Sequence, residues 1–220
     1  MEKTYLDDTA SAGKVSVDGP QAAEDYAEQA KRWLFLYKQD IARYKSHRKN
    51  TSALRLILTE QGLWALLQYR IASATYRSRL PRLIKAPLLI LATIWLKLVE
   101  MTTGISLPCQ AIIGPGLYIG HFGNIFVGED AIMGHTCNIS QGVTIGVSGF
   151  GQKRGTPRVG NRVYMAANAV AVGKITVGDD SVIAANSLAM TDVAPHTTVI
   201  GVPAQLKSNH GSAAYLDPLE

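Results

Sequence analysis

From Ile113 onward the chain repeats a six-residue pattern in which an aliphatic residue is followed by a small one. The pairs Ile113-Gly114 and Ile119-Gly120 begin the series, and Ala189-Met190 ends it. A helix cannot use this spacing, because six does not match 3.6 residues per turn and glycine at this density destabilises helices. In a parallel β-helix each hexapeptide supplies one short strand and one tight corner, and three hexapeptides make a triangular coil. The repeat therefore predicts a parallel β-helix of about five coils, with the aliphatic side chains stacked inward.

The repeat is interrupted twice. The spacing from Ile119 to Val127 is eight instead of six, and the spacing from Ile145 to Val159 is fourteen instead of the twelve of two repeats. The additional residues must bulge out of the coil. The second excursion, residues 147–158, is too rich in glycine and charge for a coil face. We expect an external loop there, because loops on rigid scaffolds often carry the chemistry.

The net charge of +5 conceals a division along the chain. The first thirty residues are acidic, with a net charge of −5, and are expected to form a mobile arm. Residues 31–97 carry 14 Lys and Arg against only two acids, Asp40 and Glu60. These features divide the chain into four parts: a mobile acidic arm (1–30), a basic α-helical region (31–103), the repeat domain (104–207) and a C-terminal tail (208–220).

The spacing of apolar residues predicts helices in the basic region over 22–45, over 52–76, and from Pro87 to about Met101, with Gly104 at the end of the last helix. Two interpretations of the basic charge remain open: a solvated helical surface, or contact with an anionic lipid surface. The last helix is apolar on most faces. It packs against a neighbour or another subunit, or it lies in the plane of a membrane.

The location of the protein can also be inferred from the sequence. The longest apolar run, 86–96, has 11 residues, fewer than the roughly 20 needed to span a bilayer. The chain has only two cysteines and no apolar stretch that opens it as a signal peptide would. We therefore expect a cytoplasmic protein, with contact at the inner face of the membrane as an open alternative. No nucleic-acid-binding signature accompanies the charge, so nucleic acid is not expected as a partner.

Three motifs accompany the repeat: His121 within 120–125 (GHFGNI), the run 141–146 (QGVTIG) and the closing 201–204 (GVPA). Together with the repeat they resemble the left-handed β-helix acyltransferases, in the branch that contains serine acetyltransferases and the related exopolysaccharide or capsule O-acetyltransferases. The resemblance covers about residues 104–207. It implies a left-handed coil, against the usual right-handed crossover. It also implies acetyl-CoA as the acetyl donor and a homotrimer with active sites between adjacent prisms.

Transfer of an acetyl group from a thioester to a hydroxyl requires removal of the hydroxyl proton, and imidazole is a suitable acceptor at neutral pH. His121 lies at a coil corner just before the first irregularity, so we expect it outside the prism as the general base. His135 also lies at a corner, but nothing around it breaks the repeat, and we expect it to face solvent. A backbone N–H near Gly146 could stabilise the oxyanion. Gln141 either orients substrate or is an ordinary corner residue.

The donor site is expected along a groove beside the later coils. In the enzymes that this sequence resembles, small residues on two successive coils contact the CoA arm, and the matching positions here are Ala166, Ala167, Asn168, Ala184, Ala185 and Asn186. Small side chains also suit a tight corner without any ligand. The cations placed by motif to bind phosphate are Lys153, Arg154, Arg158 and Lys207. Histidines and cysteines do not cluster at metal-ligand spacing, so no metal is expected.

The acceptor is inferred from departures from the serine acetyltransferase pattern. In those enzymes the loop ends in Arg-His-Pro, whereas this chain has Gly155-Thr156-Pro157. Gly120 replaces the acid before the catalytic histidine, and Ser106 replaces an upstream acid. Serine would lose the anchors for both its charged ends, while Thr156 would face a neutral acceptor. The sequence thus favours a sugar or polysaccharide precursor, small or lipid-linked. Free serine and a catalytically silent trimeric scaffold remain as alternatives.

Overall fold

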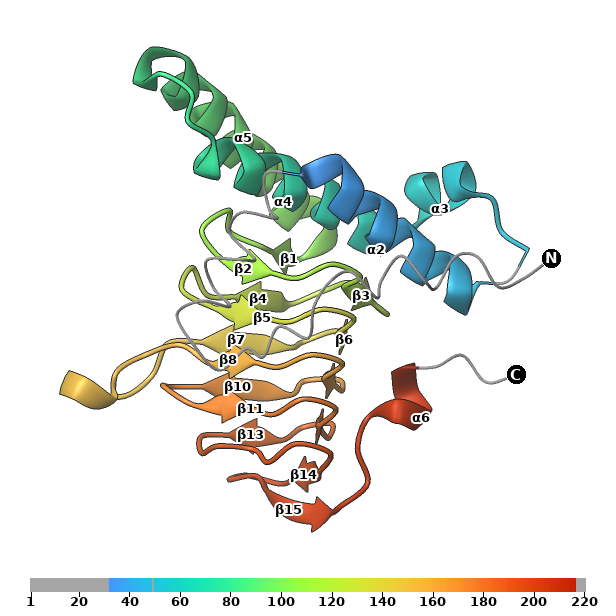
Figure 1. Ribbon diagram of the computed structural model, residues 1–220, viewed down its shortest axis with the longest axis vertical. Helices are drawn as coiled ribbons and strands as arrows, with labels where there is room; N and C mark the ends of the chain where they lie inside the picture. The colour runs from blue at the N-terminus through green and yellow to red at the C-terminus, as the bar shows by residue number, and fades with distance from the viewer. Residues whose placement is uncertain (1–31, 49, 217–220) are drawn as a thin grey trace.

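The computed structural model describes residues 32–48 and 50–216; the predicted acidic arm, residues 1–30, lies outside this part of the chain. Helices lie across one end of a three-sided prism of short strands (Figure 1). A short helix, α6 (Ala213–Leu216), lies beside the prism. The helices at the end of the prism are α2 (Trp33–His47), α3 (Ala53–Thr59), α4 (Gln61–Arg77) and α5 (Arg82–Thr103).

Successive strands visit three faces in turn. The first face contains β1 (Ile105–Ser106), β4 (Ile125–Val127), β7 (Thr144–Gly146), β10 (Val170–Val172) and β13 (Leu188–Ala189). The second face contains β2 (Ile112–Ile113), β5 (Ile132–Met133), β8 (Arg158–Val159) and β11 (Thr176–Val177). The third face contains β3 (Tyr118–Ile119), β6 (Asn138–Ile139), β9 (Tyr164–Met165), β12 (Val182–Ile183), β14 (Thr198–Ile200) and the antiparallel β15 (Gln205–Ser208). The predicted parallel β-helix is confirmed.

The aliphatic residues of the repeat form the core of the prism. On each face they are register partners from coil to coil, as in Ile119, Ile139 and Met165 on the third face. Each is at most 4% exposed. Stacking of this kind removes apolar surface from water along the whole axis. The buried set is Ile113, Ile119, Val127, Met133, Ile139, Ile145, Val159, Met165, Ala171, Val177, Ile183 and Ala189.

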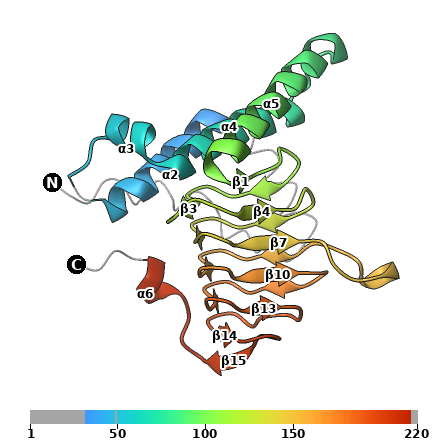
Figure 2. The ribbon, with the colours of Figure 1, turned by 180° about the vertical axis from the view of Figure 1, so that it is seen from behind.

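The second interruption of the repeat is larger than expected. Val127 and Met133 are six positions apart, and their partners in the next coil, Ile145 and Val159, are fourteen apart. The expectation that the interval from Ile145 to Val159 contains two repeats with two additional residues was therefore wrong. The interval contains a single corner, with eight additional residues. The inserted residues form the external loop that the composition predicted. An antiparallel bridge joins Ser148 to Gly155 at the base of this loop, which projects away from the prism on the side opposite β3 (Figures 1 and 2).

The helices also differ in detail from the expectation. The predicted helix over 52–76 is interrupted at Glu60, whose extended backbone (φ −99°, ψ 107°) ends α3 and begins α4. Pro87 lies in the second turn of α5, because this helix begins earlier, at Arg82. Gly104 adopts a left-handed conformation (φ 67°) and ends α5, as glycine commonly does at this position.

Side chains from α2 and α4 satisfy the open edge of the first coil. The Arg70 guanidinium binds both carboxylate oxygens of Asp40 and donates to the carbonyls of Ile113 and Gly114. Asp40 also accepts from the backbone N–H groups of Gly116 and Leu117. Both charged side chains are buried, at 0% and 1% exposure. The helical region is therefore a polar cap on an edge that would otherwise present unpaired backbone groups.

Tyr44 extends this cap to the strand that precedes His121. Its hydroxyl donates to the carbonyl of Ile119 at 3.0 Å and accepts from the Ile119 N–H at 3.1 Å. Burial raises the pKa of Tyr44 well above its ordinary value, so the phenol keeps the proton that it donates. A Cβ on Gly62 would meet both the Tyr44 hydroxyl and Ile119, so glycine is needed where α4 passes β3.

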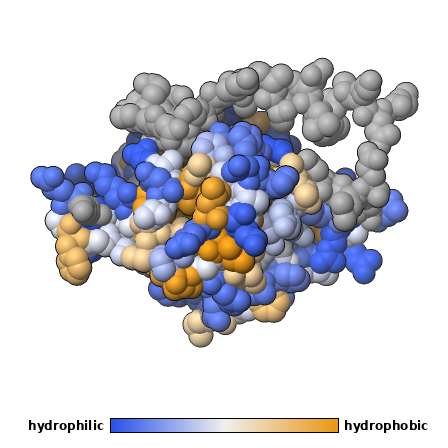
Figure 3. Space-filling model, turned by 90° about the horizontal axis from the view of Figure 1, so that it is seen from below, coloured by the Kyte–Doolittle hydropathy of each residue, from blue (hydrophilic) through white to orange (hydrophobic). Residues whose placement is uncertain are grey.

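Apolar surface remains exposed at both ends of the molecule. On α5 the exposed side chains include Leu83, Ile90 and Met101. Among the described helices, none combines the length and hydropathy needed to cross a bilayer. The last coil exposes Ile200, Val202 and Leu206, and a view from this end shows hydrophobic surface at its centre (Figure 3).

Candidate active site

The corner between the third and first faces, which we call the histidine edge, brings several predicted site residues together. His121 follows β3, and Gln141 follows β6 one coil further on. Backbone hydrogen bonds of 2.9 Å join successive corners, from Gly142 to Gly123, from Asn168 to Gln141 and from Asn186 to Ala167. The six small residues predicted for the donor groove therefore lie on this edge, on the coils beyond Gln141: Ala166, Ala167, Asn168, Ala184, Ala185 and Asn186.

The loop residues lie at a different corner, between the first and second faces, which we call the loop edge. Gly146 ends β7, and Thr156, at the base of the loop, lies against Gly128. Arg154 and Arg158 lie in the same segment, as does the backbone of Lys153, in a 3-10 turn. Lys207 lies in β15, at the end of the prism far from the helices (Figure 1). One protomer alone therefore does not bring His121 together with Gly146, Thr156 or the predicted cations.

The chemistry of the histidine edge fits a long, narrow ligand. The side chains of Ala166, Ala167 and Ala185 are short, and the Asn168 and Asn186 amides are hydrogen-bonded to each other at 3.1 Å. Both asparagines adopt a left-handed conformation, with φ of 58° and 55°, which asparagine tolerates better than most residues. The edge therefore presents backbone and methyl groups against which a pantetheine arm can lie closely.

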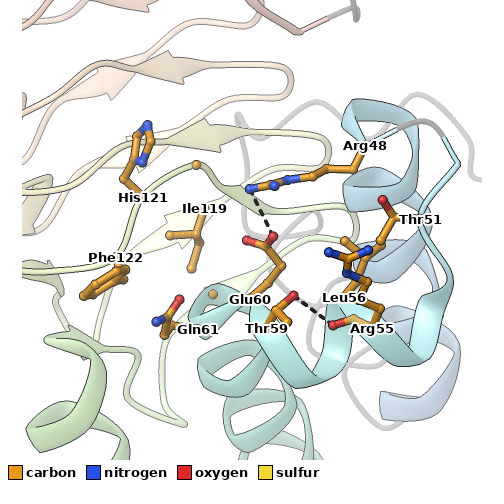
Figure 4. A pocket seen from close by; sticks show the side chains of 12 residues that line it. Arg48, Thr51, Arg55, Leu56, Thr59, Glu60, Gln61, Ile119, His121 and Phe122 are labelled. Atoms are coloured by element: carbon orange, nitrogen blue, oxygen red, sulfur yellow. Dashed lines mark hydrogen bonds and ion pairs between the residues drawn. The ribbon is translucent and has the colours of Figure 1, made fainter.

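His121 lines a pocket of about 440 Å³ between the first coil and the helices. This volume is in the range of small-molecule sites. The helical side of this pocket carries charged and polar side chains: Arg48, Thr51, Arg55, Thr59, Glu60 and Gln61. Figure 4 shows Arg48 extended across the pocket toward the side where His121 lies. Sequence reasoning missed this side of the site. The signal available in the sequence was Glu60, one of only two acidic residues in the segment 31–97, which contains 14 basic residues.

Arg48 and Glu60 form an ion pair with 3.1 Å between Nη2 and Oε1. The Arg48 side chain is 55% exposed and the Glu60 side chain 17%. Glu60 occupies the break between α3 and α4, and Arg48 follows the last residue of α2. Nearby, burial raises the pKa of Tyr118, which therefore stays neutral at physiological pH. The pocket is thus lined by one negative group, the largely buried Glu60, and by two positive groups, Arg48 and Arg55.

Gln141 has an unused acceptor. Its Oε1 is buried and makes no hydrogen bond with any residue of the described ranges. A buried amide oxygen without a partner is costly.

His135 differs from the expectation that it faces solvent. It is half-buried, and its Nδ1 lies 3.1 Å from the Thr136 hydroxyl, while its backbone N–H donates to Asn161. Burial lowers the pKa of His135. The residue lies at the corner between the second and third faces, away from His121, because the chain turns from β5 to β6 there.

Comparison with known proteins places these observations in a family. A curated serine acetyltransferase from Helicobacter pylori is 34% identical over 150 residues, 68% of this chain and 83% of the relative. One from Synechococcus elongatus is 31% identical over 169 residues, 77% of this chain, and the match spans 65% of that relative. No protein-family model matches the chain.

Solved structures of serine acetyltransferases are also similar to this chain. A serine acetyltransferase from Brucella abortus has a TM-score of 0.71 at 25% identity, covering 90% of this chain and 81% of that one. The Neisseria gonorrhoeae enzyme in complex with serine has a TM-score of 0.68 at 27% identity, covering 87% and 78%. A serine acetyltransferase in complex with CoA, at 24% identity, shares the fold with a TM-score of 0.66 over 84% and 73%. The predicted left-handed β-helix with an N-terminal helical region is confirmed.

The expected sugar or polysaccharide acceptor is wrong. The relatives and neighbours described above are serine acetyltransferases, and they give no support to the exopolysaccharide branch, a glycan acceptor or membrane contact. The prediction considered only coil and loop positions as anchors for serine and left out the charged side chains that the helices contribute to the lining of the His121 pocket. The predicted enzyme class, an acetyl-CoA-dependent O-acyltransferase, is confirmed. The chain belongs to the serine acetyltransferase family.

Proposed function

We propose that this protein transfers the acetyl group of acetyl-CoA to the hydroxyl of L-serine, with His121 as general base. The observation that carries the proposal is the position of His121: it lies beside a pocket whose opposite wall presents an arginine and a glutamate, in a chain 34% identical to a curated serine acetyltransferase. A zwitterionic acceptor suits a pocket with both signs of charge.

The proposed reaction follows from the chemistry of the two substrates. His121 takes the hydroxyl proton as the serine oxygen attacks the thioester carbonyl, which forms a tetrahedral oxyanion. The C–S bond then breaks, and the imidazolium returns its proton to the CoA thiolate. The products are O-acetyl-L-serine and free CoA. Gln141, one coil beyond His121 on the same edge, would help to orient the substrate.

Acetyl-CoA is proposed to lie along the histidine edge, with its thioester at His121 and its pantetheine arm on Ala166, Ala167 and the coil beyond. The small side chains of this edge support close approach. Gly146, Thr156 and the cations of the loop lie at the loop edge, so they can join the site only if another copy supplies them. We therefore propose a homotrimer in which the loop edge of one prism faces the histidine edge of its neighbour.

Thiol release tests the activity. Purified protein is mixed with acetyl-CoA and a thiol reagent, with L-serine, with neutral sugars, or with no acceptor. We expect release that depends on L-serine. Release that depends on a sugar instead, or no release in any arm, would refute the serine assignment, and the second result would favour a silent scaffold.

Mixed oligomers test the shared site. His121→Ala removes the base, and replacement of residues 149–154 by Asn-Gly shortens the loop while keeping a two-residue hairpin at the Ser148–Gly155 bridge. Each variant alone should have at most about a hundredth of wild-type activity. Coexpression in equal amounts should restore about a quarter of wild-type activity, since that fraction of neighbouring pairs combines an intact base with an intact loop. In the control, the two variant proteins are assembled separately and then mixed. A site between protomers would be contradicted if the coexpressed sample regained no activity, or if only the control regained activity.

A further inference from the structure

The acceptor pocket poses a problem of charge. An α-amino acid carries an ammonium and a carboxylate, and burying either without a partner is costly. The coil and loop positions at which this chain departs from the serine acetyltransferase pattern are Ser106, Gly120, Gly155 and Thr156, none of which carries a charge. The charged side chains that line the His121 pocket come from the helical region instead: Arg48, Arg55 and Glu60.

We propose that Arg48 and Glu60 form the amino-acid recognition site, with Arg48 binding the α-carboxylate and Glu60 the α-ammonium of the acceptor. The assignment rests on the serine acetyltransferase activity proposed above and specifies how that site selects its substrate. It makes the helical region, which also caps the first coil, a part of the substrate site.

The geometry of the pair favours this role. Glu60 is held at the break between two helices and is 17% exposed, whereas Arg48 is 55% exposed at the end of a flexible side chain. In the free protein the two groups neutralise each other across 3.1 Å. A zwitterion can replace that single contact with two, its ammonium on the Glu60 carboxylate and its carboxylate on the planar guanidinium, which matches a carboxylate with two parallel hydrogen bonds.

The orientation then follows from the pocket. Figure 4 shows Arg48 and Glu60 meeting in the pocket while His121 lies on the coil across from the helices. With both α-substituents bound on the helical wall, the side chain of the amino acid is left to point toward the coil. In serine this side chain is one methylene group that ends in the hydroxyl, so the hydroxyl would point toward the His121 imidazole.

A purely structural role for the pair is the competing explanation. Ion pairs near the surface contribute little to stability, so loss of Arg48 or Glu60 should leave the fold intact. The chain offers a matched control in the Lys97–Glu100 pair of α5, with 2.6 Å between its charged atoms and side-chain exposures of 65% and 23%. It lies outside the His121 pocket.

Calorimetric titration of the full-length protein, saturated with CoA, separates these explanations. The probes are L-serine, L-serinamide, which lacks the carboxylate, and 3-hydroxypropanoate, which lacks the ammonium. Arg48→Gln should weaken L-serine binding about 10- to 100-fold and leave L-serinamide unchanged. Glu60→Gln should weaken L-serine and L-serinamide alike and leave 3-hydroxypropanoate unchanged. Lys97→Gln should change none of the three.

Other results would overturn the proposal. L-serine binding that survives both substitutions, equal losses for all three probes, or no binding of L-serine to the wild-type protein each contradicts it. Measurement of turnover distinguishes failure of this recognition site from failure of the proposed activity. If L-serine binds through Arg48 but no O-acetylserine forms, recognition stands and the proposed activity fails; if L-serine is acetylated equally well by the Arg48→Gln protein, the activity stands and this recognition site fails.

Discussion

Alanine in place of His121 should lower kcat by about 10²- to 10⁴-fold, the usual contribution of a positioned general base. The residue is exposed on a corner beside a pocket, so its removal should leave intact the core and the small-residue positions proposed to bind CoA. Steady-state rates of thiol release with L-serine give kcat, and equilibrium titration with CoA should show an affinity within a few-fold of wild type.

His135→Ala is the matched control. This histidine also lies at a coil corner, but at a different edge and half-buried against its neighbours. Its loss should leave kcat nearly unchanged. Activity of the His121→Ala protein within a few-fold of wild type, or an equal loss in the His135→Ala protein, would remove His121 from the role of base.

Arg70→Met should destabilise the folded protein by about 3–5 kcal/mol, the usual cost of leaving a buried charge without its partner. Arg70 and Asp40 are 1% and 0% exposed, and the guanidinium also binds two carbonyls of the first coil. The substitution leaves the Asp40 carboxylate with only two backbone donors and leaves the two carbonyls unpaired. The midpoint of urea denaturation and the melting temperature measure the loss.

Arg79→Met makes the same chemical change on the surface, where Arg79 is exposed. We expect a change within about 0.5 kcal/mol there. Equal stabilities of the Arg70 and Arg79 variants would show that the helical region does not cap the first coil in the way described.

The β-helix could be predicted from the sequence because every coil requires aliphatic residues at the same six-residue spacing. Each aliphatic residue at the six-residue spacing must point inward, and those positions, from Ile113 to Ala189, are buried in the structure. His121 could be placed outside the prism for the same reason, since a break in the repeat releases the chain from the core. Local pattern and tertiary structure agree at these buried positions.

The loop shows the limit of counting along the chain. The fourteen positions from Ile145 to Val159 fit two repeats with two additional residues as well as one repeat with a long insertion. Only the pairing of Met133 with Val159 decides between them. The spacing therefore located the loop but did not give its length or the edge from which it leaves.

The His121 pocket could not be predicted because its walls come from residues 48–62 and 119–122, which are far apart in the sequence. Nothing in the spacing of Arg48, Glu60 and His121 brings them together; the contact depends on how α4 crosses β3 at Gly62. The sequence shows that the basic segment contains only two acids, but it does not show what they contact. Both are paired with arginines, Asp40 with Arg70 in the cap and Glu60 with Arg48 in the pocket.

The most direct test of this account is the formation of O-acetyl-L-serine by the purified protein, identified by mass spectrometry and measured at steady state. With acetyl-CoA as donor we predict a product that contains one acetyl group on the serine oxygen, and a kcat/KM for L-serine of at least about 10⁴ M⁻¹s⁻¹, the lower end of ordinary enzyme efficiency. Release of CoA at the same rate with and without L-serine, and no acetylated serine, would contradict it.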